Sequence, residues 1–134
     1  MKHEFTFAEV SKIFAQVVKI EEAVKKQQEL EAQYSDAEVE FDKEFEKCGW
    51  TFRNAPKELH EMFEIKSELM KLRDNTGRKA YRLIKEFMEL TGESGEWYDE
   101  QIKHYLKGRY YWQAPKLVDY IKCIAKKTAK KVKF

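Results

Sequence analysis

The sequence has few of the residues that break helices or cross-link chains: two prolines, five glycines and two cysteines among 134 residues. So few turn-forming residues argue against an all-β fold, in which short strands alternate with Gly- and Pro-rich turns. Leu, Lys, Glu, Gln and Ala dominate instead, and these residues favour the α-helix. Two cysteines with no signal peptide ahead of them predict a reducing compartment, the cytoplasm, rather than a disulfide-linked secreted protein.

Long apolar runs and catalytic motifs are also missing. No stretch stays apolar over the roughly 20 residues that a membrane-spanning helix needs, so we expect no contact with a membrane. GxSxG, P-loop and GxGxxG patterns do not occur. The segment His60–Glu64 lacks the second histidine of a zinc-binding HExxH motif, and Glu100 with His104 supplies only two ligands. We therefore expect no enzymatic activity, no metal and no cofactor.

What the sequence has in quantity is charge, and this charge is unevenly distributed. Charged residues make up 37% of the chain, with a net charge of +2. Residues 1–66 carry 10 Lys/Arg and 15 Asp/Glu, a balance of −5, whereas residues 67–134 carry 16 and 9, a balance of +7. This asymmetry predicts an acidic scaffold with a basic functional end, although two solvated helix faces that attract each other would give the same pattern.

The first half of the chain is predicted to begin with one long helix over residues 7–47. Thr6 and Glu9 form a capping-box sequence at its start. A second capping box at residues 35–38 leaves open whether the segment is one helix or two. Apolar residues recur at three- and four-residue steps, which predicts a buried stripe. The stripe comprises Phe7, Val10, Phe14, Val17, Ile20, Val24, Leu30, Tyr34, Ala37, Phe41 and Phe45.

A second long helix is predicted after the turn at Gly49, with Pro56 in its first turn and its end at Thr91–Gly92. Gly77 costs about 1 kcal/mol in a helix interior, so we expect a local kink there. Two segments of similar length with a short connection should pair antiparallel. Each needs more cover than the other supplies, so we expect the C-terminal helices, or a second copy in a homo-oligomer, to pack on this hairpin. The expected stripe comprises Leu59, Met62, Phe63, Leu69, Leu72, Tyr81, Ile84, Phe87 and Met88.

Two shorter helices, over about residues 96–107 and 115–131, are predicted to follow. The expected fold is therefore all-α: a long antiparallel hairpin (residues 1–92) and a basic, aromatic C-terminal region (residues 93–134), packed as one compact unit. Cys123 has apolar neighbours and is expected in the core. The last helix should bury one apolar side, made of Leu117, Val118, Ile121, Ile124 and Ala125.

The C-terminal region also carries the candidate binding surface. From Gln101 to the end there are ten Lys/Arg and a single acid, Asp119. Arg, Tyr and Trp are the preferred anchors of protein interfaces. Exposed rings beside lysines can equally stack on unpaired bases while the lysines neutralise phosphates. The candidate partner-binding residues are Arg109, Tyr110, Tyr111, Trp112, Lys103, Lys107, Lys122, Lys126, Lys127, Lys130 and Lys131.

The order of elements over about residues 79–127 resembles the helix-turn-helix core of small phage-repressor-type domains. In those domains an apolar residue of the recognition helix is followed six residues later by glycine, and then by a Pro-led helix. Ile102, Gly108 and Pro115 follow this order. The resemblance implies DNA binding, but three acids at positions 96–100 open the helix that would face the base edges, where phosphates repel carboxylates.

Together these features predict a non-enzymatic protein that binds a protein partner. It would act as an adaptor or as an inhibitor, such as a phage-type blocker of a host nucleic-acid enzyme. The alternative is a nucleic-acid-binding protein that stacks on single strands or acts as a degenerate helix-turn-helix repressor. A third interpretation is that the aromatic rings are part of the core and the lysines only solvate the last helix.

Overall fold

The computed structural model describes residues 5–49, 51–53, 55–93 and 114–131. Within these residues the chain forms three helices, and no strand occurs among them. The helices are α1 (Phe7–Lys47), α2 (Lys57–Thr91) and α4 (Ala114–Ala129).

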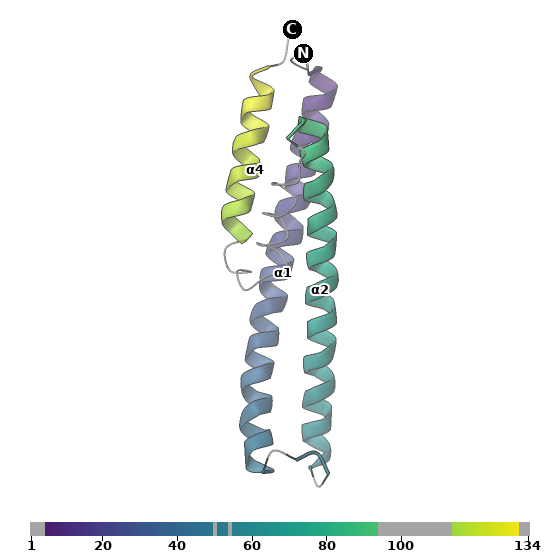
Figure 1. Ribbon diagram of the computed structural model, residues 1–134, viewed down its shortest axis with the longest axis vertical. Coiled ribbons are helices and arrows are strands. Elements are labelled where there is room, and N and C mark those ends of the chain that lie inside the picture. Colours follow the sequence, from purple (N-terminus) through teal and green to yellow (C-terminus); the bar gives the residue numbers. More distant parts are fainter. Residues whose placement is uncertain (1–4, 50, 54, 94–113, 132–134) are drawn as a thin grey trace.

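α1 and α2 lie side by side as a long antiparallel hairpin, and α4 packs along the end of the hairpin that holds both termini (Figure 1). α4 contacts α1 more extensively than α2. The predicted all-α class and the hairpin are therefore confirmed. The predicted helix over residues 96–107 and the loop after it lie outside the described residues. No helix in the described parts of the chain is long and apolar enough to cross a membrane.

α1 is a single helix of 41 residues, roughly 60 Å long. Its capping box is formed: the amide of Glu9 donates to Thr6 Oγ1 at 3.1 Å, and the amide of Thr6 donates to Glu9 Oε1 at 3.1 Å. The second capping-box sequence, at residues 35–38, does not start a new helix. Arg73 of α2 contacts α1 just before this point, and no helix-breaking residue opposes the continuous helix.

α2 begins and ends close to the predicted positions. Pro56 is its N-cap, with an extended backbone, rather than a residue of its first turn. The helix ends at Gly92, whose φ of 78° lies in the left-handed region that glycine tolerates best. The Glu93 amide donates to the Met88 carbonyl at 2.8 Å and closes the last turn. The helix continues through Gly77, which is buried.

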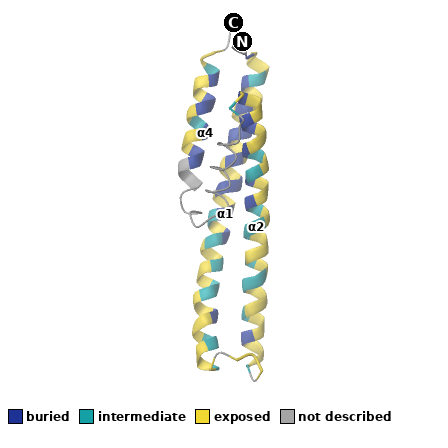
Figure 2. Cartoon of the chain, viewed as in Figure 1, coloured by how far each residue is buried: buried dark blue, intermediate teal, exposed yellow. Residues whose placement is uncertain are grey.

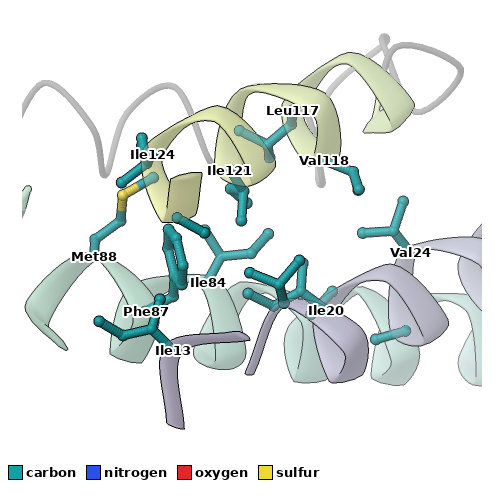
Figure 3. Close-up of a cluster of buried hydrophobic side chains, with 14 of the residues drawn as sticks. Ile13, Ile20, Val24, Ile84, Phe87, Met88, Leu117, Val118, Ile121 and Ile124 are labelled. Carbon is teal, nitrogen blue, oxygen red and sulfur yellow. The ribbon is translucent and has the colours of Figure 1, made fainter. Parts of the chain in front are cut away.

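The main core lies where all three helices meet (Figure 3). Ile20 of α1, Phe87 of α2 and Ile121 of α4 are completely buried there. The predicted apolar side of α4 is confirmed, since all five of its members are buried. The core side chains of the three helices are Val10, Ile13, Val17, Ile20, Ala23, Val24, Ala80, Ile84, Phe87, Met88, Leu117, Val118, Ile121, Ile124 and Ala125.

Two predicted members of the α1 stripe are exposed. Phe7 is exposed and Phe14 is 40% exposed, whereas Ile13 and Gln16 are buried. The reason is that α1 contacts both α2 and α4 in this half of the molecule. The buried side of α1 is therefore centred on the side where Ile13 lies, and Phe7 and Phe14 lie at the edge of that side.

Other expected core residues are also exposed. Phe63 and Leu72 of α2 lie in the half of the hairpin that α4 does not reach, so only α1 covers them among the described helices (Figure 2). Cys123 was expected in the core and is exposed as well. It follows the buried Ile121 by two residues, and two residues turn an α-helix by about 200°, so its side chain points outward.

The turn end of the hairpin is held by aromatic rings. Phe41 is buried, and it packs with Phe45, Phe52 and Phe63 at ring-centroid distances of 5.4, 5.9 and 5.7 Å. The Lys66 ammonium lies 4.9 Å from the centroid of the Phe41 ring. This aromatic cluster replaces the third helix as the source of apolar contacts at this end.

Candidate partner-binding surface

α4 is oriented by its apolar side, so its basic side is directed to solvent. Leu117, Ile121 and Ile124 pack against the hairpin, and Thr128 is buried one turn further on. The Thr128 hydroxyl donates to the Ile124 carbonyl at 2.9 Å, so this buried hydroxyl has its partner inside the helix. Four lysines of α4 and of the turn that follows it are exposed, and we call them the lysine cluster: Lys126, Lys127, Lys130 and Lys131.

Lys122 has a different environment from the lysine cluster. Its ammonium lies 3.0 Å from the Glu21 carboxylate of α1. Both side chains are about half exposed, and ion pairs of this kind contribute little to stability. Lys122 therefore already has a partner within the chain and is the least available of the described candidate lysines.

The lysine cluster has no ion pair with any residue that the structure describes. Lys126 and Lys127 lie in the last turn of α4, where the partial negative charge of the helix end stabilises cations. Four positive charges therefore lie within six residues at one end of the rod. Such a surface attracts acidic groups at a distance.

A hollow of about 500 Å³ lies next to the lysine cluster. The exposed ring of Tyr120 and the thiol-bearing Cys123 line it from α4, and Glu93 lines it from the end of α2. Lys127, Lys130 and Lys131 border the same hollow, together with Ile124 and Thr128. An aromatic ring and several ammonium groups therefore meet at one concave place. This combination suits a partner that presents a carboxylate beside an apolar or flat group.

The other candidate residues cannot be placed on this surface. Arg109, Tyr110, Tyr111, Trp112, Lys103 and Lys107 all lie outside the described residues, and their role stays a prediction. The helix-turn-helix resemblance also stays a prediction, because its expected recognition helix and the glycine after it fall within residues 94–113. Its first described part, residues 79–92, is the end of the 35-residue α2.

No group of three or more His, Cys, Asp or Glu side chains that could hold a metal ion occurs among the described residues. His60 belongs to the aromatic cluster instead, with its ring centroid 5.2 Å from that of Phe52. The helical spacing of the apolar residues did not predict this cluster as a unit. Its signal in the sequence is the set of four phenylalanines on both sides of the turn, at positions 41, 45, 52 and 63.

Arg73 forms a polar contact between the hairpin helices, as Gln16 does with the Leu83 carbonyl and Glu86. Its guanidinium pairs with Glu31 at 2.9 Å and lies 4.6 Å from the centroid of the Tyr34 ring. Burial, followed by a hydrogen bond with Glu38, raises the pKa of Tyr34. The neutral phenol is therefore favoured in the folded chain. This contribution to stability is present below the unfolded-state pKa of about 10 and is lost as the pH rises through the folded-state pKa.

Comparison of this chain with protein-family models, with curated proteins and with solved structures finds no match.

Proposed function

We propose that this protein is a non-enzymatic binding protein that docks an acidic surface of a partner protein with the lysine cluster of α4. The observation that carries the proposal is the set of four exposed lysines without ion pairs among the described residues, beside the hollow that Tyr120 lines. Tyrosine is one of the residues that most often anchor protein interfaces. The lysines would speed and orient association, and the ring would supply buried contact area.

A protein partner is favoured over nucleic acid by the charge of the rest of the rod. Residues 29–72 carry twelve Asp/Glu and six Lys/Arg. A nucleic acid that lay along the hairpin would meet this acidic half, where its phosphates would be repelled. A protein partner needs only a local acidic patch opposite α4. In this role the protein would act as an adaptor or an inhibitor, for example a phage-type blocker of a host nucleic-acid enzyme.

Nucleic-acid binding is the second candidate, and the hollow beside Tyr120 is the observation that favours it. An unpaired base could stack on the ring while Lys127 and Lys130 contact phosphates. Both candidates place the protein in a reducing compartment, which we propose is the cytoplasm. The two free thiols, Cys48 and Cys123, support this assignment.

The test compares two charge-matched variants in a pull-down from native lysate of the organism that encodes the protein, with and without nuclease. The first variant changes the lysine cluster to Gln (K126Q, K127Q, K130Q, K131Q). The control changes four exposed lysines elsewhere to Gln (K25Q, K43Q, K57Q, K71Q). We expect a protein that is captured by the parent and by the control, is lost with the cluster variant, and is unaffected by nuclease.

A third variant tests the predicted aromatic part of the surface, with Tyr110, Tyr111 and Trp112 changed to Ala. For a protein partner it should weaken binding by about 2 kcal/mol or more if a ring is a buried anchor. For nucleic acid, the lysine-cluster variant should instead flatten the plot of log affinity against log salt by about one unit per lost phosphate contact. Equal binding by the cluster variant and the control would refute the proposal. Circular dichroism of each variant must first show an intact fold.

A further inference from the structure

Both helices of the hairpin change the sign of their charge at the same height. α1 carries four lysines and two glutamates between Lys12 and Lys26, and then eight acids and two lysines between Glu29 and Lys47. α2 carries four acids and one lysine between Glu58 and Glu68. It then carries six basic residues and one acid between Lys71 and Lys85.

The Glu31–Arg73 ion pair shows that the two sign changes coincide. It joins α1 two residues after Glu29 to α2 two residues after Lys71, so these positions lie at one height of the rod. The turn end of the hairpin is therefore acidic on both helices, and the α4 end is basic on both. The same division places the lysine cluster of α4 at the basic end (Figure 1).

One side of α2 carries apolar residues that no described element fully covers. Ile65 and Leu72 are 57% and 52% exposed, and Leu90 is exposed as well. Apolar residues recur along this side at steps of seven residues or multiples of seven. Such steps keep residues on one side of a helix that wraps around a neighbour. We call this set the seam, and its members are Met62, Ile65, Leu69, Leu72, Leu83 and Leu90.

The seam is directed away from α4. Met88 lies beside Ile124 of α4 (Figure 3). Leu83 precedes Met88 by five residues, which places it about 140° away around the helix. On the seam side, α1 and α2 leave a hollow of about 370 Å³ that Glu40 and Met62 help to line. Glu40 therefore marks the side of α1 that borders the seam, and Lys12, Lys19 and Lys26 precede it by multiples of seven residues.

We propose that two copies of this chain pair antiparallel through the seam side of the hairpin, with a two-fold axis near Arg73. About this axis the basic end of one hairpin lies against the acidic end of the other. Lys19 of one copy falls opposite the Glu38–Glu40 region of its partner, and Glu68 falls opposite Arg82. The seam contributes the apolar layer between them, with Leu69 opposite Leu83, and the four hairpin helices form a bundle.

The charge pattern favours a second copy of this chain as the partner, and it favours the antiparallel orientation of that copy. A parallel pair would place the acidic turn end of one hairpin beside the acidic turn end of the other, and it would be repelled. An antiparallel pair neutralises both ends at once, and it is isologous, so the dimer closes and does not grow further. The lysine cluster lies on α4, outside this contact, and stays available to another partner.

Zero-length cross-linking of the wild-type protein with a carbodiimide tests the antiparallel pairing. The reagent forms an amide bond only between a lysine and a carboxylate that are in direct contact. Within one chain, Lys19 and Glu40 are separated by 21 residues of continuous helix, about 32 Å. Lys12 and Glu44 are about 48 Å apart on the same basis. An amide bond within either pair must therefore join two copies. We expect such bonds between residues 12–26 and 36–46 by mass spectrometry.

Sedimentation or light scattering supplies the second measurement. The parent should have the mass of a dimer that dissociates as salt is raised, and the double variant I65D/L72D should be a monomer with unchanged helix content. The control Y120D places the same charge on an exposed residue of α4, outside the proposed contact, and it should stay a dimer. A parent that is monomeric up to its solubility limit would overturn the proposal. A dimer without the 12–26 to 36–46 cross-links would overturn it as well.

Discussion

Val17 and Val18 are identical neighbours on α1 in opposite environments. Val17 is 6% exposed and faces the three-helix core, whereas Val18 is 56% exposed. We expect Val17→Asp to destabilise the fold by about 3–5 kcal/mol, because it buries an unpaired charge. Val18→Asp introduces the same charge in water and should cost about 1 kcal/mol or less, mainly in helix propensity. Urea denaturation followed by circular dichroism measures both, and similar losses would mean that this side of α1 does not face a core.

The same pair of environments explains which core residues the sequence could identify. Spacing correctly selected Val10, Val17, Ile20 and Val24, because any helix that buries one side must bury residues at those steps. It selected Phe14 rather than Ile13, although both residues fit the three- and four-residue steps. Only the direction from which α4 approaches decides between them, and that direction is a tertiary property.

At the scale of the element, the helix ends were the most predictable features, because their signals are local. The capping box at Thr6 is formed, and Pro56 and Gly92 cap α2 at its two ends. The prediction of one long helix over residues 7–47 is also confirmed, although the second capping-box sequence left a break near Tyr34 open. The contact of Arg73 with Glu31 beside this point, by contrast, joins residues 42 positions apart in the chain, and local signals could not predict it.

Gly92 allows a direct test of how α2 ends. Its φ is 78° and a Cβ placed on it would meet no atom within 4 Å, so substitution carries a conformational cost without a clash. We expect Gly92→Ala to lower the free energy of unfolding by about 1 kcal/mol. Gly92→Asn should cost less, because asparagine tolerates the left-handed region better. Thermal denaturation of both variants checks the order, which a steric effect would reverse because asparagine is larger.

At the scale of the molecule, the sequence predicted a charge difference between the two halves of the chain. In the structure the difference lies between the two ends of the hairpin. Residues 1–66 have a net charge of −5, yet Lys12–Lys26 lie at the α4 end, beside the basic C-terminal region. Only the antiparallel hairpin brings these segments to one end. The exposure of the lysine cluster, by contrast, followed from the apolar spacing of α4 alone, since Ile121, Ile124 and Ala125 fix which side turns inward. The aromatic part of the candidate surface, Tyr110 to Trp112, lies outside the described residues and stays a prediction.

The way in which α4 completes the core predicts that hairpin and C-terminal region unfold as one unit. Ile121 is completely buried against Ile20 and Ile84, which belong to the two other helices (Figure 3). Ile121→Asp should therefore cost about 3–5 kcal/mol, as much as Val17→Asp, although the two positions are more than 100 residues apart. Hydrogen exchange should accelerate at residues 10–24 and 80–88 as well as in α4, because their shared core is lost. The control Lys127→Asp places the same charge on the exposed side of α4 and should leave exchange in the hairpin unchanged. If Ile121→Asp released α4 while the hairpin amides stayed protected, the two regions would be separate folding units, and the hairpin would have to be stabilised without α4.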